Sequence, residues 1–423
     1  CATIISAKGG LPETITNGII LNQVNEEQVY QGIKKLIQDS KYRKKLCYLS
    51  YKNFKNDLNS SVKKYDQIRD SVFNTKLNGG IFNINKNPSL RIMHVTNFSE
   101  RHDGRLYFVS IGQKISNGFI RSGHSVLNYS DRDMMRIGRG FPDYIGKKNL
   151  NKKLISAVKN YNPHLVLFGH ADLIHKSTLE IIKSYNKNLK VAQWFEDPLI
   201  ENGPDYEKNK EKVLGKVDFI DHSFLTTSPD DLEFKLNGSI FHYMPIPADK
   251  SVERLKNFEN KNTIYDVFFA MSHGVNRGNL KSGKVDEREI IINKLIELNK
   301  NLKFDIYGYK NRYPVWSESF YKAISNCSMA LNLNRGKSKK YSCSNRIASL
   351  MGNGLLTFMD NEKKFDHFFK RDEIIFFDNE VDLLEKLNYF KIHKVERVKI
   401  AKNGQDKYFK LFNECNVAKY IVE

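Results

Sequence analysis

Short apolar runs alternate with amphipathic helical segments along most of this 423-residue chain. Such alternation is typical of parallel βαβ units, in which a buried strand is followed by a helix that covers the sheet. The pattern divides the chain into a short section over residues 1–75, a linker over 76–89, and two longer sections over 90–245 and 246–423. The sequence therefore predicts an α/β protein with more than one parallel sheet.

The section over residues 1–75 has too few strands for a complete sheet. The run CATIIS predicts a strand, a Gly9-Gly10 turn follows, and apolar residues at helical spacing from Val29 to Ile37 predict a helix. Because this strand begins at Cys1, we expect the tail end of a larger domain, cut within its fold. The Asn-, Gly- and Pro-rich residues 76–89 predict a linker.

Each of the two longer sections repeats strand and helix often enough to form a complete Rossmann-like domain. The first contains RIMHV, HSVLNYS, HLVLFGH, VAQWF and FIDHSFLTT, and the second contains YDVFFAMS, LKFDIYGY, SMALNLN and LLTFMD. One connector, YMPIPADKS, joins them. We expect a cleft between the carboxyl ends of the two sheets, where open α/β folds bind their ligands.

The net charge of +20 arises from 68 Lys and Arg residues against 48 Asp and Glu residues. Enrichment in Lys and Asn is also what an AT-rich genome produces, so the charge alone is ambiguous. Its functional interpretation is attraction to nucleotide diphosphates, anionic lipid surfaces or nucleic acid. No five basic residues are consecutive and no nucleic-acid-binding motif occurs, so we expect no nucleic-acid partner.

The cysteine pattern and the hydropathy favour a cytoplasmic protein. The five cysteines are scattered without a CxxC pair, which argues against a disulfide framework and a structural zinc site. No apolar run approaches the ~18 residues of a membrane span. We expect at most peripheral contact with the inner membrane face through basic patches. HExxH, GxSxG and metal-spaced clusters are missing from the sequence, so we expect no metal and no covalent hydrolysis.

The loop after YDVFFAMS is a candidate diphosphate site. It contains His273, Gly274, Arg277 and Lys281 ahead of a predicted helix, which supplies amide N–H groups, cations and a helix N-terminus. The alternative is a solvated basic loop. The same stretch nearly matches the P-loop pattern, but Val285 stands where Ser or Thr would reach magnesium, so a P-loop ATPase is disfavoured.

A second candidate loop precedes the helix IASLMGNG. Ser344 is a plausible N-cap, and the amides of Ser344 and Asn345 are available to an anion. Arg346 falls in the first helical turn, where a cation is unfavourable unless an anion is bound nearby. The alternative is a guanidinium that extends into solvent. Gly352 and Gly354 are explained as residues that end the helix and form a tight turn.

Further candidates follow strands of the section over residues 90–245. His102 and Asp103 lie in the loop after RIMHV, where either side chain is a candidate general base. His170 in FGHAD and Glu196-Asp197 in WFEDP also end strands. These three residues are candidates to contact a substrate hydroxyl, or else they cap the following helices.

The passage GGLPETITNGIIL resembles the late part of the C-terminal domain in the group 1 family of nucleotide-sugar glycosyltransferases. In that family the paired-glutamate motif that holds the donor sugar lies upstream of this point. The resemblance implies that residues 1–75 are the truncated C-terminal part of a first transferase module, without activity of their own.

A second passage, from SMALNLNRG to LLEKLNYF, is similar to the spore-maturation-protein type of glycosyltransferase-like domain. It has an LNLxR strand, an Arg that opens a helix and an EIIFF strand, and Arg335 and Arg346 fall on the two arginines of the family. YMPIPAD resembles the Pro-containing interdomain segment of GT-B enzymes. The chain departs from the pattern at Ser349, where the family carries a Glu that often contacts the donor ribose.

The resemblance implies a GT-B fold, with residues 90–245 as the acceptor domain and 246–423 as the donor domain. It implies a glycosyltransferase, hexosyltransferase-like and of class EC 2.4, that uses a nucleotide-diphosphate sugar without a metal or cofactor. The expected acceptor is a cell-envelope polysaccharide, a glycolipid or a protein. Arg277, Lys281 and Arg346 would stabilise the charge of the leaving diphosphate.

The stereochemistry and the activity itself have alternatives. An inverting enzyme needs a base, His102 or Asp103, whereas a retaining enzyme needs none. One alternative function is a non-catalytic nucleotide-sugar-binding module that supports a partner transferase. Another is a phosphorylase or an epimerase on the same fold.

Overall fold

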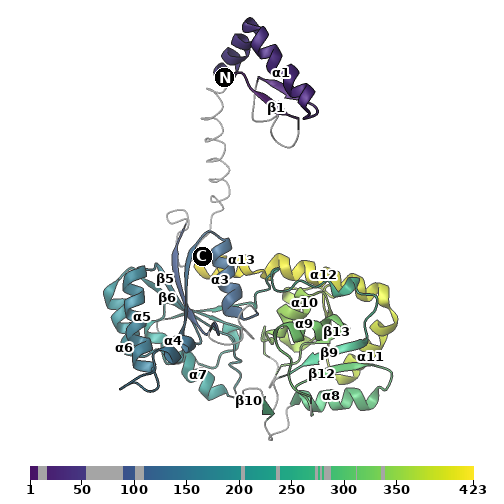
Figure 1. Cartoon of the computed structure of the whole chain (residues 1–423). Helices are drawn as coiled ribbons and strands as arrows, with labels where there is room; N and C mark the ends of the chain where they lie inside the picture. Colours follow the sequence, from purple (N-terminus) through teal and green to yellow (C-terminus); the bar gives the residue numbers. More distant parts are fainter. Residues whose placement is uncertain are drawn as a thin grey trace. The chain divides into compact units, whose positions relative to one another are not determined.

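The structure, a computed structural model, describes residues 1–7, 17–53, 89–100, 109–201, 205–234, 239–271, 275–276, 279–280, 287–310, 312–334 and 339–423. The chain divides into two compact units, Cys1–Asn78 and Gly79–Glu423 (Figure 1). The seven predicted site residues His102, Asp103, His273, Gly274, Arg277, Lys281 and Arg335 lie outside the described residues.

The first unit contains a parallel strand pair with helices. β1 (Ile4–Ser6) pairs with β2 (Ile19–Leu21). α1 (Glu26–Gln38) begins after Asn25, whose side chain accepts a hydrogen bond from the amide of Gln28, and residues 40–53 are also helical. The strand and the helix that the sequence predicts here are present, and the origin of this unit as part of a larger domain stays a prediction.

The second unit contains two larger parallel sheets, which confirms the α/β prediction. The first has the strand order β4-β3-β5-β6-β7-β8, and every neighbouring pair in it is parallel. Its strands are β3 (Arg91–Thr96), β4 (Ser125–Ser130), β5 (Leu165–Gly169), β6 (Lys190–Phe195), β7 (His222–Leu225) and β8 (Ile240–Tyr243). We call this sheet and its helices the N-terminal lobe.

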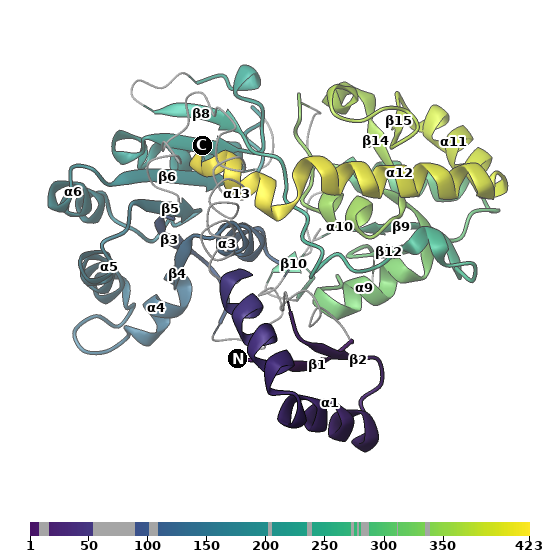
Figure 2. The same ribbon diagram turned by 90° about the horizontal axis from the view of Figure 1, so that it is seen from above.

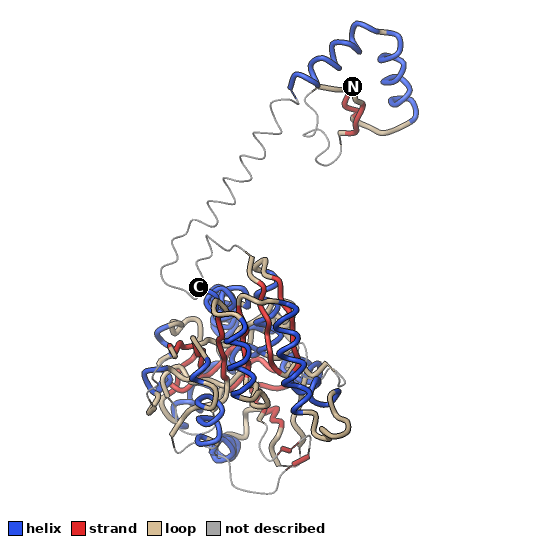
Figure 3. The backbone as a smooth tube through the Cα atoms, turned by 90° about the vertical axis from the view of Figure 1, so that its left-hand side faces the viewer, coloured by secondary structure: helices blue, strands red, loops and turns tan. Residues whose placement is uncertain are grey.

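Helices flank this sheet, as the tube in Figure 3 shows. Leu165–Gly169 is buried at every position, as expected for a central parallel strand covered on both faces. The helices are α3 (Ile111–Arg121), α4 (Asp131–Ile137), α5 (Lys147–Tyr161), α6 (Lys176–Tyr185) and α7 (Tyr206–Leu214), with short 3-10 turns at Val217–Phe219 and Pro229–Asp231.

The second sheet, with the order β12-β9-β13-β14-β15, is also parallel throughout, and with its helices we call it the C-terminal lobe. Its strands are β9 (Tyr265–Ala270), β12 (Phe304–Tyr307), β13 (Cys327–Leu331), β14 (Leu356–Asp360) and β15 (Ile375–Phe377). A separate antiparallel pair is formed by β10 (Val275–Asn276) and β11 (Asn279–Leu280). The helices are α8 (Glu287–Leu298), α9 (Ser317–Ser325), α10 (Arg346–Gly352), α11 (Glu380–Ile392), α12 (Lys394–Phe412) and α13 (Glu414–Val422), with 3-10 turns at Asn257–Glu259, Asn361–Lys363 and Phe365–His367.

The end of the chain returns to the N-terminal lobe. α12 runs along the C-terminal lobe, and α13 then packs against α3 (Figure 2). Ala248, in the connector between the lobes, forms a parallel bridge with Asn413, so two chain segments pass side by side between the lobes. The sequence pattern assigns residues 246–423 to one domain and does not indicate this return.

Side chains of α3 fix the two lobes to one another. Lys114 forms a buried ion pair with Glu253, and Arg121 forms ion pairs with Asp249 at 2.7 Å and with Glu414 at 2.6 Å. Asn117 donates to Asp249 at 2.8 Å. Because the three α3 residues are spaced by three and four positions, they share one face of the helix.

Candidate functional site

A cavity of about 790 Å³ in the second unit is lined by both lobes. It lies at the carboxyl ends of β3, β5 and β6 of the N-terminal lobe and of β9 and β13 of the C-terminal lobe. The N-terminal lobe contributes Thr96, Asn97, Gly169, His170, Trp194, Glu196 and Asp197, and the C-terminal lobe contributes Met271, Trp316, Asn334, Ser344, Asn345, Arg346 and Ser349, among others. The predicted position of the ligand cleft agrees with this cavity.

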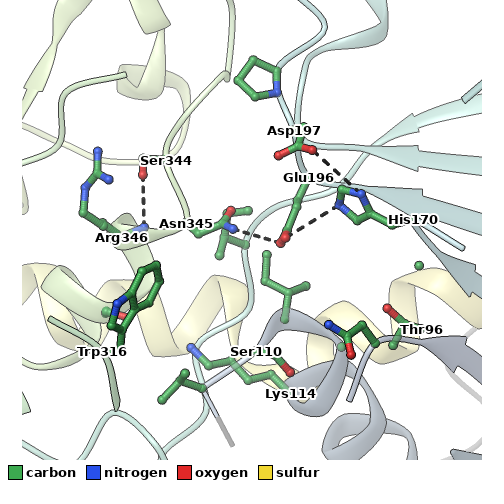
Figure 4. Close-up of a pocket in the computed structure, with 18 of the residues that line it drawn as sticks. Thr96, Ser110, Lys114, His170, Glu196, Asp197, Trp316, Ser344, Asn345 and Arg346 are labelled. Carbon is green, nitrogen blue, oxygen red and sulfur yellow. Dashed lines mark hydrogen bonds and ion pairs between the residues drawn. The ribbon is translucent and has the colours of Figure 1, made fainter. Parts of the chain in front are cut away.

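Three predicted residues, His170, Glu196 and Asp197, come together on the wall of the N-terminal lobe (Figure 4). Nε2 of His170 lies 3.7 Å from Oε1 of Glu196, and Nδ1 lies 3.8 Å from Oδ2 of Asp197. Both separations are longer than hydrogen bonds. Within the described part of the chain, the buried Nε2 has no hydrogen-bond partner.

The backbone under His170 is held in an uncommon conformation. His170 and Ala171 have φ angles of 57° and 33°, in the left-handed region that residues with a Cβ rarely adopt. Nζ of the buried Lys216 donates to the carbonyl oxygens of His170 at 2.9 Å and of Lys212 at 3.2 Å. Lys216 therefore joins the C-terminal end of α7 to the turn that directs the imidazole at the cavity.

Burial sets the protonation states of this group. It lowers the pKa of His170 to about 4, against a smaller opposing effect of Asp197, so the imidazole is neutral at pH 7. Burial, reinforced by the charge of Asp197, raises the pKa of Glu196 to about 7. The cavity wall thus holds a neutral imidazole beside a carboxyl that exchanges its proton near neutral pH.

A hydrogen bond crosses the cavity between the lobes. The side-chain amide of Asn345 donates to Oε2 of Glu196 at 2.9 Å (Figure 4). α10 begins at Arg346, and Asn345 before it has helical angles, φ −50° and ψ −22°, and forms no side-chain cap bond. Oγ of Ser344 accepts a long 3.5 Å contact from the amide of Arg346, which is the contact that an N-cap serine makes.

The guanidinium of Arg346 folds against its own lobe. Nη2 donates to the carbonyl of Leu333 at 2.6 Å, and the guanidinium carbon lies 5.2 Å from the ring centroid of Phe269. Both contacts hold the planar group at the cavity edge. Arg346 therefore lines the cavity, and its role in binding an anion stays a prediction.

A buried cation of the C-terminal lobe, Lys363, was not predicted. Lys363 is 1% exposed and contacts the carbonyl of Asn332 at 3.5 Å. Burial, with a smaller contribution from the charge of Arg346, lowers the pKa of this lysine to about 8. In the sequence Lys363 is one of many lysines after a strand, so no pattern distinguishes it.

Sequence reasoning also missed two charged residues at the cavity edge. Arg132 and Asp172 line the cavity and form an ion pair at 2.5 Å. Each follows the end of a strand, in the segments NYSDR and FGHAD. The rule that selected His170 would have found both, because the carboxyl ends of parallel strands share one edge of the sheet.

Trp194 is a buried residue of the cavity wall that is held by a hydrogen bond. Its indole Nε1 donates to Nε2 of the buried His94 at 2.8 Å, and Nδ1 of His94 contacts Oγ of Ser116 at 2.8 Å. Since Nε2 accepts, Nδ1 carries the proton and donates to Ser116. A Cβ on Gly169 would lie 2.2 Å from the Trp194 ring, so glycine is required at that strand end.

No group of three or more His, Cys, Asp and Glu side chains suited to a metal ion occurs among the residues that the structure describes. In the same residues, no helix combines the length and the apolar character needed to span a membrane.

Comparison with protein families gives one match, and it falls in the C-terminal lobe. The model of the family described as glycosyl transferase-like matches residues 288–423. The matched residues run from α8 to α13. With two Rossmann-like lobes facing one cavity, the second unit has the GT-B architecture that the sequence predicts. The match includes Ser344, Asn345 and Arg346.

Several solved structures are similar to this chain. HepE from Anabaena, in complex with UDP-glucose, is 10% identical with a TM-score of 0.49 over 78% of this chain and 98% of its own. Sucrose-phosphate synthase from Thermosynechococcus elongatus is 12% identical with a TM-score of 0.44 over 78% of this chain and 96% of its own. A comparison with curated proteins finds no match to this sequence.

Proposed function

We propose that the protein transfers a sugar from a nucleotide-diphosphate sugar to an acceptor hydroxyl in the cavity between its lobes. The observation that carries the proposal is the composition of this cavity. A glycosyltransferase-like lobe supplies Arg346, and the facing lobe supplies a neutral imidazole and a carboxyl with a pKa of about 7.

On the donor side, the diphosphate binds at the C-terminal lobe. Arg346 compensates the negative charge that grows as the bond between the sugar and the diphosphate oxygen breaks. The predicted donor residues His273, Gly274, Arg277, Lys281 and Arg335 belong to the same lobe in sequence and complete this proposed site. Charge compensation by these cations makes a metal ion unnecessary in the proposed mechanism.

On the acceptor side, His170, Glu196 and Asp197 orient the attacking hydroxyl. The unpartnered Nε2 of His170 is an acceptor for that hydroxyl proton, at the end of the cavity opposite Arg346. For an inverting reaction, the proton passes to a base in the loop after β3. Asn97 and Ser99 of this loop line the cavity, and the predicted bases His102 and Asp103 follow them.

The acceptor class and the location stay proposals. We propose a cell-envelope polysaccharide, a glycolipid or a protein as the acceptor, and a cytoplasmic enzyme that contacts the membrane peripherally.

Ser349 supports a second candidate function. This residue lines the cavity at the position where the resembling family carries a glutamate for the donor ribose. A lobe that lacks this contact is compatible with a non-catalytic nucleotide-sugar-binding module. Turnover separates the two: a transferase releases nucleotide from a donor sugar in the presence of acceptor, whereas a binding module retains the donor intact.

The first experiment measures binding of UDP-, GDP-, ADP- and CMP-sugars by thermal shift and calorimetry. We expect at least one ligand to bind, and Arg346→Ala to weaken it by about tenfold or more, since charge-assisted bonds to phosphate are lost. Arg254→Ala is the matched control, because Arg254 is a 61% exposed arginine paired with Glu318 in the same lobe. Absence of binding by every donor, or equal binding by both variants, would contradict the proposed site.

A further inference from the structure

The segment between α4 and α5 exposes a cluster of large apolar side chains. Ile137, Phe141, Tyr144 and Ile145 are 55%, 87%, 71% and 66% exposed, respectively. Scattered exposed apolar residues are common, but here four fall within nine residues, and the ring centroids of Phe141 and Tyr144 lie 6.1 Å apart. Figure 2 shows this connection projecting at the edge of the N-terminal lobe beside α4 and α5.

Hydrogen bonds hold this segment in shape. The carboxylate of Asp143 accepts from the amides of Gly146 at 2.9 Å and Asn149 at 2.8 Å, which lowers its pKa. The side chain of Asn149 donates to the carbonyl of Gly138 at 2.7 Å. A Cβ on Gly146 would lie 1.9 Å from the Met135 carbonyl oxygen, and its φ of 83° also requires glycine.

This internal bonding determines what the segment presents to its surroundings. Asp143, the single carboxylate of residues 136–148, is bound to backbone amides at the start of α5 and partly compensated there. The side chains of Phe141, Tyr144 and Ile145 are exposed to solvent. The apolar surface is therefore built into the fold by specific backbone contacts.

Cations surround the apolar side chains. Residues 136–148 contain Arg136, Arg139, Lys147 and Lys148 against the one Asp143. α5 continues with Lys152, Lys153 and Lys159 and contains no acidic residue. Lys148, Lys152 and Lys159 are exposed and lie on one side of the helix.

We propose that residues 136–148 and the lysines of α5, which we call the docking surface, bind the surface of an anionic lipid bilayer. Exposed Phe, Tyr and Ile side chains suit the boundary between headgroups and acyl chains. The flanking Lys and Arg side chains reach the phosphates of anionic lipids at the same depth. An apolar centre flanked by lysines and arginines, with the one carboxylate of Asp143 bound to backbone amides, is complementary to such a bilayer.

The docking surface is connected to the cavity by one short helix. α4 begins with Asp131 and Arg132, which line the cavity, and ends at Ile137 in the docking surface. Seven helical residues span about 10 Å. A bilayer bound there lies close enough to the cavity for a lipid-linked acceptor. This last step rests on the proposed transferase function, whereas membrane binding does not.

The test is co-sedimentation of the full chain with lipid vesicles, without nucleotide. One set contains phosphatidylcholine alone, and the other contains equal amounts of phosphatidylcholine and phosphatidylglycerol. We expect binding to the anionic vesicles only, and weakening of that binding by salt. Equal binding to both sets, or no binding to either, would overturn the proposal.

Three variants locate the surface. The triple variant Phe141→Ser, Tyr144→Ser, Ile145→Ser and the double variant Lys147→Gln, Lys148→Gln should each bind anionic vesicles about tenfold or more weakly. The matched control is Ile392→Ser, Val395→Ser, which removes side chains that are 76% and 86% exposed in the C-terminal lobe. All substituted residues are solvent-accessible, and thermal unfolding checks that each variant is folded.

The outcomes separate this inference from the proposed function. A triple variant that binds vesicles as the wild type does would place the membrane contact elsewhere and refute the docking surface. A vesicle-binding protein that binds no nucleotide sugar would refute the transferase proposal and leave the docking surface standing. If the triple variant loses a protein partner but not vesicles, the surface is a protein interface and the proposal is wrong.

Discussion

Single side chains in the cavity have protonation states set by their surroundings. His94 is fully buried, which lowers its pKa to about 3, and its two ring nitrogens are occupied by Trp194 and Ser116. His170 is neutral for the same reason, but its buried Nε2 has no hydrogen-bond partner among the described residues. Glu196 differs from both, because its pKa of about 7 makes its charge depend on pH near neutrality. Of these residues, Glu196 is the one whose titration should be measurable.

The prediction for Glu196 concerns stability against pH. The pKa of Glu196 is about 7 in the folded state and 4.5 in the unfolded state. The contribution of this carboxyl to stability is therefore fully present below pH 4.5 and is lost as the pH rises through about 7. Glu196→Gln keeps the acceptor for Asn345 and removes the charge. We expect the variant to be more stable than the wild type at pH 8, by about 1–3 kcal/mol, and equally stable near pH 4.

Chemical denaturation of both proteins from pH 4 to pH 8 measures this difference. Glu318→Gln is the control, since Glu318 is a 60% exposed carboxylate outside the cavity. A difference between wild type and Glu196→Gln that stays constant across this range would show that Glu196 does not titrate in the window.

For single residues, the sequence predicted which residues line the cavity better than it predicted which side chains contact one another. His170, Glu196, Asp197 and Arg346 were selected because they follow strand ends or open a helix, and the structure places all four on the cavity. The bond from Asn345 to Glu196 joins residues 149 positions apart, so no local pattern contains it. The contact of Lys216 with the turn at His170 was not predicted for the same reason, because these residues are 46 positions apart.

Two elements of the N-terminal lobe depend on contacts with distant parts of the chain. The turn after β5 is held by Lys216 at the end of α7. α3 is approached so closely by α13 that a Cβ on Gly118 would lie 2.0 Å from the carbonyl oxygen of Glu414. The strand–helix alternation predicted β5, α3 and α7, because burial of apolar faces leaves a periodic signal. It did not predict their packing partners.

Lys216→Met tests the turn after β5. The substitution removes the ammonium that binds the carbonyls of His170 and Lys212 and leaves buried acceptors without a donor. We expect a loss of about 1–3 kcal/mol in the free energy of unfolding. If His170 orients the acceptor, the KM for acceptor should rise while donor affinity stays the same. Lys183→Met, which removes a partly exposed ion pair with Asp221, is the control.

Gly118→Ala tests the contact between α3 and α13. Alanine is the better helix former, so in an isolated helix the change would be stabilising by up to about 1 kcal/mol. Here the added methyl group collides with the backbone of Glu414, and we expect destabilisation by about 2 kcal/mol or more. Gly140→Ala is the control, because a Cβ there meets no atom within 4 Å. Equal unfolding midpoints for the two variants would contradict the close approach of α13.

For the whole molecule, the two-sheet architecture was predictable and the joining of the lobes was not. The apolar segments from RIMHV to FIDHSFLTT predict the strands of one sheet, and those from YDVFFAMS to EIIFF predict the strands of the other. The joining relies on α3, the turn at Asp249 to Glu253, and α13, which come from three separate regions of the chain. Single charged residues such as Lys114 and Glu253 look like ordinary surface positions in the sequence, although both are buried.

The buried pair Lys114–Glu253 gives the sharpest test of how the lobes are joined. Burial raises the pKa of Glu253, and the charge of Lys114 opposes this, so each charge is compensated by the other. Glu253→Gln leaves Lys114 buried without its counter-charge, and we expect destabilisation by about 3–5 kcal/mol. Adding Lys114→Met removes the uncompensated charge, so the double variant should be more stable than Glu253→Gln alone. Additive losses in the double-mutant cycle would contradict this coupling. The exposed pair Lys402–Asp406 is the control, and Asp406→Asn should change the free energy of unfolding by less than about 1 kcal/mol.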